Sequence, residues 1–323
     1  MNFINVFAKM VELFLIIIVG YGACKAKIFD KEARVRGTKL VLNVTLPATI
    51  LASVMTQDNL PGVMQILQLL LVAVLSYVIL FASAFIVPRL IGVPKSQIGI
   101  YQFMLAFGNV GFIGYPVTQA IFGNQAVFYT SVFNLPFNLL VYSVGVMFIQ
   151  TSSATTGRET QGKALKQTSG KKPAITVKTF LSPCMVASVI SIVMALCHWK
   201  GPVLIGDTCN MIGAITTPMA LLIIGSSLAD MPFQEMFGNA RIYIFSIFRL
   251  ILVPLLIYLI FKLFVKDMLL LGVCVIIAAM PVATNGTMLC LSYQGDEKLM
   301  AQGTFLTTLL SVITIPVIAM LFI

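Results

Sequence analysis

The stretch 108–116 reads Gly-Asn-Val-Gly-Phe-Ile-Gly-Tyr-Pro and lies in the middle of an apolar segment, residues 97–122, that is long enough to cross a bilayer. Three glycines and a proline in nine residues disfavour a regular helix, because glycine loosens a helix and proline removes a backbone hydrogen-bond donor. In hydrocarbon, an interrupted helix is tolerated only where protein or a water-filled cavity surrounds the interruption. Since Asn109 adds a polar side chain at this depth, the stretch predicts half of a binding site for a solute midway across a membrane.

The composition is that of an all-α polytopic membrane protein. Of 323 residues, 59% are hydrophobic and 10% are charged, and the mean hydropathy is +1.00. Ten transmembrane helices are predicted, each near the length that a bilayer core requires. They span residues 4–23, 38–56, 63–87, 97–122, 125–149, 180–198, 209–229, 240–264, 268–292 and 300–323.

The basic residues predict the orientation of these spans. Sixteen of the 21 Lys and Arg residues lie in the loops that follow odd-numbered spans, and four lie on the opposite side. Since cytoplasmic loops carry an excess of Lys and Arg, we expect a cytoplasmic membrane with both termini outside. This distribution accounts for the net charge of +10 without a nucleic-acid partner.

A polar segment predicts the division of the chain into domains. Residues 150–179 are rich in Ser, Thr, Gly and basic side chains, which is typical of a mobile cytoplasmic linker. Five spans precede it, in residues 1–149, and five follow it, in residues 180–323. Prolines recur in the same order in the two halves: Pro47, Pro116 and Pro136 in the first half correspond to Pro218, Pro281 and Pro316 in the second. A five-span repeat reverses direction on its second pass, so we expect inverted repeats.

A second interruption is expected in the span 268–292, where residues 280–287 read Met-Pro-Val-Ala-Thr-Asn-Gly-Thr. If the spans crossed there, Asn109 and Asn285 would approach each other and half-helix N-termini would point at the midpoint. Neither interruption contains Asp or Glu, and Arg249 is the one formal charge deep within a span. A positive midpoint without carboxylates favours a small organic anion over a metal cation or a proton.

The candidate substrate-binding residues lie in the interruptions or beside prolines. They are Asn109, Gly111, Pro116, Pro281, Thr284, Asn285, Thr287, Arg249, Asn43 and Thr216. Two alternatives stay open: the asparagines can join helices without contacting a ligand, and Arg249 can bind backbone carbonyls between packed helices. An interfacial ion pair with Lys9 is the favoured explanation of Glu12, which is also the first carboxylate to test if protons drive transport.

The remaining chemistry-bearing residues predict no cofactor, no metal site and no enzyme. The six cysteines lack metal-type spacing and are expected to pack between helices, while a pairing of Cys197 with Cys209 stays open. A single histidine and the absence of a Ser-His-Asp set or nucleotide motif leave little acid–base chemistry.

Two groups of residues resemble a known family. Gly108-Asn109 followed by Gly114-Tyr-Pro116 resembles the fourth span of the auxin efflux carriers, which include the plant auxin carriers. The run from Ala279 through Asn285-Gly and Tyr293-Gln-Gly-Asp-Glu to Pro316 is similar to the last two spans of bacterial members, many of which are labelled malate or malonate permeases.

The resemblance implies an elevator-like carrier of small organic anions. Spans 3–5 and 8–10 would move against a scaffold of spans 1, 2, 6 and 7 that dimerises, and Asn109 and Asn285 would face the substrate carboxylate. The segment 151–179 is short beside the long loop of many plant carriers, which removes grounds for auxin as the substrate and favours a bacterial carrier of a metabolite. The alternatives are a sodium/proton exchanger of related architecture and a non-transporting sensor that signals through this segment.

Overall fold

The computed structural model describes residues 3–57, 60–152, 182–229 and 240–322, and within these ranges every regular element is a helix. In the first part of the chain these are α1 (Phe3–Lys25), α2 (Lys31–Leu40), α3 (Leu46–Met55), α4 (Val63–Leu90), α5 (Ile98–Ala106), α6 (Tyr115–Phe122) and α7 (Gln125–Leu140). The second part holds α10 (Pro183–Leu196), α11 (Val203–Gly213), α12 (Thr216–Ala229), α13 (Ala240–Ile247), α14 (Val253–Phe261), α15 (Met268–Ala278), α16 (Asn285–Tyr293) and α17 (Glu297–Phe322).

Several of these helices have the length and composition of membrane spans. Six helical stretches qualify, namely Lys31–Met55, Val63–Leu90, Gln125–Ser152, Val203–Ala229, Ala240–Phe261 and Glu297–Leu321, and shorter apolar helices accompany them. The structure therefore confirms the all-helical class and supports a multi-pass membrane protein. The count of ten spans and the inverted repeats stay predictions, and most of the predicted linker 150–179 lies outside the described residues.

Local capping sets several helix starts. The Asp30 carboxylate accepts a hydrogen bond from the backbone N–H of Ala33 at 2.8 Å, so the helix begins at Lys31, upstream of the predicted residue 38. Asp267 accepts from the first N–H groups of α15, which begins where the sequence predicts. Polar caps extend some helices beyond the apolar segment, and hydropathy alone does not locate those ends.

Three prolines within the spans follow a widened helical turn. The π-helical turns Val41–Thr45, Val110–Gly114 and Phe248–Leu252 each end two residues before a proline. A proline clashes with the carbonyl four residues earlier and offers no N–H, and a π turn gives its ring room without ending the helix. These turns explain how the chain stays helical on both sides of each proline.

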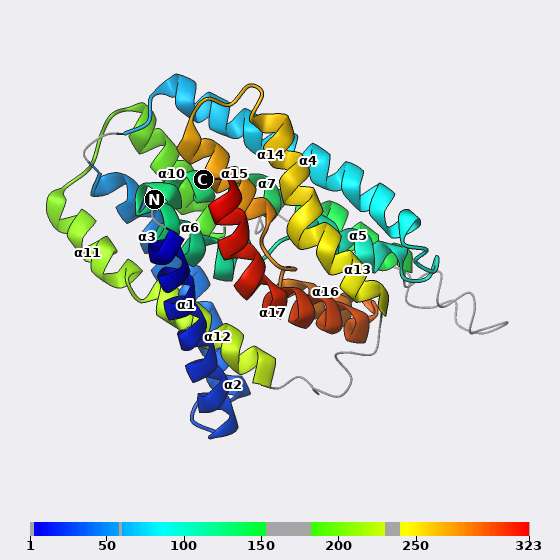
Figure 1. Cartoon of the computed structure of the whole chain (residues 1–323). Helices are drawn as coiled ribbons and strands as arrows, with labels where there is room; N and C mark the ends of the chain where they lie inside the picture. Colours follow the sequence, from blue (N-terminus) through cyan, green and yellow to red (C-terminus); the bar gives the residue numbers. More distant parts are fainter. Residues whose placement is uncertain (1–2, 58–59, 153–181, 230–239, 323) are drawn as a thin grey trace.

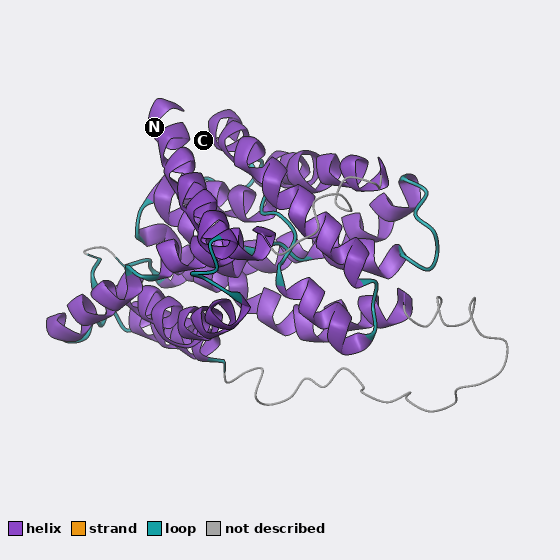
Figure 2. Ribbon diagram, turned by 90° about the horizontal axis from the view of Figure 1, so that it is seen from below, coloured by secondary structure: helices purple, strands orange, loops and turns teal. Residues whose placement is uncertain are grey.

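The helices form two groups that lie against each other (Figures 1 and 2). We define the first group as α1–α3 and α10–α12, and the second group as α4–α7 and α13–α17. The groups meet where α1 packs on α6 and α17, and where α3 and α10 pack on α7. The start of α1 and the end of α17 lie near each other in both views.

Glycines bring α1 and α12 into backbone contact within the first group. A Cβ atom added to Gly225 would lie 2.0 Å from the carbonyl oxygen of Ile17, and one added to Gly20 would lie 2.4 Å from that of Leu222. Small residues at such contacts let apolar helices approach closely and associate by packing alone. The pair α1–α12 is therefore a tightly joined unit.

Candidate functional site

Both predicted interruptions are present in the second group. The helix α5 ends at Ala106, and the chain turns helical again in the π turn Val110–Gly114 that leads into α6. In the same way α15 ends at Ala278 and α16 begins at Asn285. Each interruption thus joins the C-terminal end of one half-helix to the N-terminal end of another.

The two interruptions pair with each other through their backbones. Gly108 and Val282 form an isolated antiparallel bridge. The N–H of Asn109 donates to the carbonyl of Pro281 at 2.7 Å, and the N–H of Ala283 donates to that of Phe107 at 3.1 Å. We call residues 107–109 and 279–284 together the crossover. Backbone groups that two helix breaks would otherwise leave unpaired are therefore bonded to one another, as an apolar surrounding requires.

A third helix supports the crossover through a side chain. The N–H of Val282 donates to the Oγ1 atom of Thr307 on α17 at 3.1 Å, and Thr307 itself donates to the Gly303 carbonyl at 2.7 Å. Thr307 is not among the residues predicted from the sequence. It belongs to a polar helix face that the sequence does show, because Thr304, Thr307, Thr308 and Ser311 are spaced by three, four and seven residues from the first of them.

The two asparagines at the crossover have unused hydrogen-bonding capacity. Asn109 is only 3% exposed, and its Oδ1 atom accepts from the N–H of Phe112 at 3.2 Å, while its Nδ2 atom is buried without a partner. The Oδ1 atom of Asn285, the first residue of α16, is also buried without a partner. Buried polar groups without partners are uncommon and mark positions where a ligand can supply the missing bond.

The other predicted residues of the interruptions surround these asparagines in the chain. Pro116 is buried in the first turn of α6, and Gly111 faces open space, since a Cβ atom added there would meet nothing within 4 Å. Thr284 and Thr287 are half-buried, and the Thr287 hydroxyl donates to the Thr284 carbonyl at 2.9 Å. The structure thus gathers at and beside the crossover all seven residues predicted in the interruptions, Pro281 among them.

Arg249 also reaches the crossover. Its side chain is 1% exposed, and its Nη1 atom donates to the carbonyl of Ala278, the last residue of α15, at 2.9 Å. Of the two alternatives left open by the sequence, this contact corresponds to binding of a backbone carbonyl between packed helices.

Three further candidates lie elsewhere. Asn43 is exposed and donates to the Lys39 carbonyl in its own helix at 2.8 Å. Thr216 is buried between helices of the first group, where its hydroxyl meets that of Thr49 at 2.8 Å. Glu12 is exposed near the start of α1, and the side chain of Lys9, its predicted partner, lies outside the described part.

The cysteines and metal-ligating side chains add no second centre. All six cysteines are free thiols, including Cys197 and Cys209, whose pairing the sequence left open. Across the described ranges, no three His, Cys, Asp or Glu side chains are grouped so that they could hold a metal ion.

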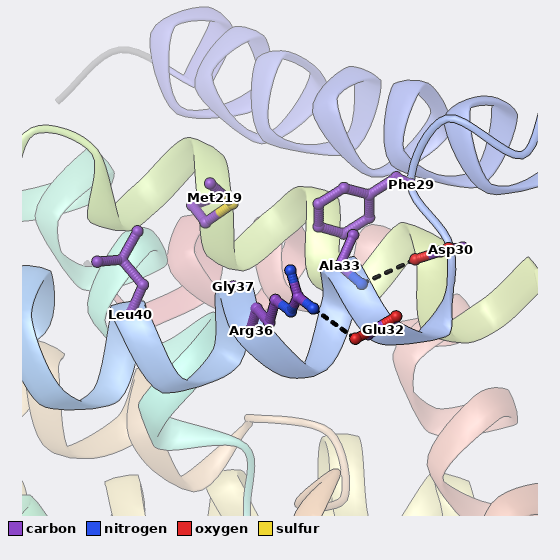
Figure 3. A pocket seen from close by; sticks show the side chains of 8 residues that line it. All are labelled: Phe29, Asp30, Glu32, Ala33, Arg36, Gly37, Leu40 and Met219. Carbon is purple, nitrogen blue, oxygen red and sulfur yellow. Dashed lines mark hydrogen bonds and ion pairs between the residues drawn. The ribbon is translucent and has the colours of Figure 1, made fainter.

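Two pockets differ in their relation to the crossover. A small one of about 40 Å³ lies between the two helix groups, where Ile113 and Val117 meet Leu13 of α1, Leu221 of α12 and Thr308 of α17, whose buried Oγ1 atom has no partner. A larger one of about 460 Å³ lies between α2 and α12. Figure 3 shows that its rim holds the Arg36–Glu32 ion pair, at 2.5 Å, and the Asp30 cap. No crossover residue lines either pocket, but two residues that line the smaller one, Ile113 and Val117, follow Asn109 within the first interrupted span.

Comparison with known proteins identifies the family. Residues 5–319 match the family described as "Membrane transport protein". The chain belongs to this family. It is the auxin efflux carrier family that the spans around Asn109 and Asn285 resemble, so the predicted resemblance is confirmed.

Relatives in archaea and bacteria carry transporter names. An uncharacterized transporter of Methanocaldococcus jannaschii is 25% identical over 309 residues, which cover 93% of this chain and 94% of the relative. One of Methanothermobacter thermautotrophicus is 21% identical over 98% of both chains. The uncharacterized transporter YfdV of Escherichia coli is 22% identical over 76% of this chain and 75% of its own. The chain is therefore a membrane transporter, and its family is not one of enzymes.

Proposed function

We propose that the chain is a secondary active transporter of small organic anions, mono- or dicarboxylates such as malate or malonate, that works by alternating access. The observation that carries this proposal is the crossover, where two half-helix N-termini begin beside Asn109 and Asn285, each of which has one buried side-chain atom without a partner. Each N-terminus carries roughly half a positive charge, so the pair favours an anion. No acidic residue occurs in the spans 97–122 and 268–292 to bind a cation or exchange a proton instead.

The proposal assigns Asn109, Asn285, Gly111, Thr284 and Thr287 to the substrate. The Asn109 Nδ2 atom would donate a hydrogen bond to the substrate carboxylate. The hydroxyls of Thr284 and Thr287 and the N–H groups at the helix N-termini would donate the remaining hydrogen bonds to it. Pro116 and Pro281 would keep the backbone in place around the anion. The small pocket beside Ile113 and Val117 would then connect the anion to the boundary between the two helix groups.

An elevator-like motion is the proposed route across the membrane. The second group, with both interruptions, would move as one body against the first group. Two features support this: the backbone pairing joins the interruptions to each other, and the glycine contacts join α1 to α12. By family resemblance, the first group would also form a homodimer.

The proposal includes ten spans in two inverted repeats, residues 1–149 and 180–323, within a cytoplasmic membrane and with both termini outside. The corresponding positions of the two interruptions support the repeats. The close approach of the two chain ends supports an even number of spans.

Counterflow in proteoliposomes tests the proposal. Labelled malate would be exchanged against a panel of unlabelled carboxylates by the wild type, by Asn109→Ala, and by Asn210→Ala as a control at an exposed position of α11. We expect competition by a few acids, retained in the control and abolished in Asn109→Ala. Absence of flux with every acid under every ion gradient would refute carboxylate transport, and cation-dependent proton flux would point instead to an exchanger.

A further inference from the structure

The charge of Arg249 has an unusual place in this fold. Arg249 is the largest of the fully buried side chains in the described part of the chain. No described carboxylate pairs with it. Its Nε atom is buried without an acceptor, which costs about 1–3 kcal/mol. Such a charge is retained only where something other than an ion pair stabilises it.

Two helix ends supply that stabilisation. The Nη1 atom bonds to the carbonyl of Ala278, where α15 ends. The Nη2 atom lies against Gly108, two residues after the end of α5, so close that a Cβ atom there would be 2.3 Å away. Each helix C-terminus carries roughly half a negative charge. Their sum is about one negative charge, which the guanidinium neutralises.

This arrangement separates the two signs of charge at the crossover. Arg249 contacts the last residue of α15 and lies against Gly108, two residues past the end of α5, while Asn109 precedes the turn that leads into α6 and Asn285 begins α16. With the negative ends neutralised, the positive ends dominate at the proposed anion site. In carriers with interrupted helices, C-terminal ends and unwound carbonyls are where a coupling cation binds.

We propose that Arg249 is a built-in cation that takes the place of a coupling metal ion at the crossover. Resting on the proposed function, the inference makes Arg249 a positioning residue that holds the half-helix ends and does not touch the solute. Transport then requires no sodium or other metal cation. The guanidinium suits this position because its planar, spread charge can contact two helix ends at once, which a lysine ammonium does less well.

Chemical rescue in proteoliposomes tests this inference. Wild type, Arg249→Ala and the exposed control Arg36→Ala would be compared in counterflow with sodium, potassium or N-methyl-D-glucamine as the cation. We expect wild-type and control rates to agree within about twofold in all three cations. Arg249→Ala should lose about tenfold or more, since a charge at a helix end contributes up to about 2 kcal/mol. Guanidinium chloride at about 20 mM should restore flux, unlike N-methyl-D-glucamine chloride.

Thermal unfolding in detergent gives a readout that does not depend on transport. Guanidinium should raise the melting temperature of Arg249→Ala and leave that of the wild type unchanged, and sodium should not stabilise the wild type. If Arg249→Ala does not accumulate, Arg249→Lys should be more stable than Arg249→Gln, because it keeps the charge.

Three results would overturn the inference. They are a sodium requirement of the wild type, an Arg249→Ala variant with normal stability but a raised KM, and an Arg249→Lys variant no more stable than Arg249→Gln. If the wild type moves no carboxylate at all, the proposed function fails, and the melting experiments still decide whether Arg249 is the built-in cation.

Discussion

Replacing Gly108 by alanine is expected to destabilise the protein strongly, whereas the same change at Gly111, three residues further along, is not. A Cβ atom on Gly108 would lie 2.3 Å from the Nη2 atom of Arg249 and 3.2 Å from the Cβ atom of Met280. Neither contact is acceptable without movement. Because Arg249 is 1% exposed, its guanidinium can move only by leaving the Ala278 carbonyl.

The expected cost follows from these two contacts. Overpacking a filled interior costs about 1–3 kcal/mol, and a lost hydrogen bond from a charged donor costs about 1.5–3 kcal/mol. Together they amount to roughly 2.5–6 kcal/mol, or a fall in melting temperature of about 5–12 °C at roughly 2 °C per kcal/mol. Gly111→Ala adds a methyl group in open space within a helical turn, so we expect a change between zero and a gain of about 1 kcal/mol.

The assay is thermal unfolding of the purified protein in detergent, with the two alanine variants side by side. Adding Arg249→Ala to each background makes a double-mutant cycle. The cost of Gly108→Ala should fall by at least about half when Arg249 is absent, because the clashing group is gone. Equal melting temperatures of the Gly108→Ala and Gly111→Ala variants, or an unchanged cost in the Arg249→Ala background, would refute this account of the crossover.

Three further predictions concern the site and the packing around it. Asn109→Asp keeps an acceptor for the following helix, but its charge would repel a carboxylate about 4 Å away by about 4 kcal/mol and reduce counterflow about a thousandfold. Normal uptake by this variant would contradict the assignment of Asn109 to the substrate. Thr307→Val removes the acceptor for a crossover N–H and should cost about 1–3 kcal/mol in thermal unfolding, with Thr307→Ser close to wild type. Gly225→Ala would place its Cβ atom 2.0 Å from the Ile17 carbonyl oxygen and should reduce the yield of folded protein in size-exclusion chromatography. Gly22→Ala on α1, where a Cβ atom meets nothing within 4 Å, should leave that yield unchanged.

Local composition was sufficient to locate both interruptions. The density of glycine and proline around Asn109 and around Asn285 disfavours a continuous helix whatever the surroundings are. The partner of each backbone group was not predictable. That Gly108 faces Val282 depends on the crossing of two helices far apart in the sequence, and hydropathy carries no information about that register.

Whether a side chain points into the site depends on how its helix is rotated about its own axis. The sequence predicts this rotation only where one face of the helix is clearly polar. Asn43 and Thr216 were chosen because they lie near prolines, yet one is exposed and the other packs on Thr49, away from the crossover. The position of Arg249 along its span predicts its depth, whereas its contact with the Ala278 carbonyl depends on how the helices pack. Thr307 could have been found, since its polar neighbours recur at helical spacing.

The crossover is held together largely by main-chain atoms, and this bears on how such a protein changes through evolution. The bonds of Asn109 to Pro281 and of Ala283 to Phe107 join backbone N–H and carbonyl groups, so they persist whichever side chains occupy those positions. If Thr284 contacts the solute as we propose, substitutions there would alter the preferred solute and leave these bonds in place, because its side chain takes no part in them. Single substitutions in the site would then change which solute a family member prefers, while the backbone pairing of the crossover is kept.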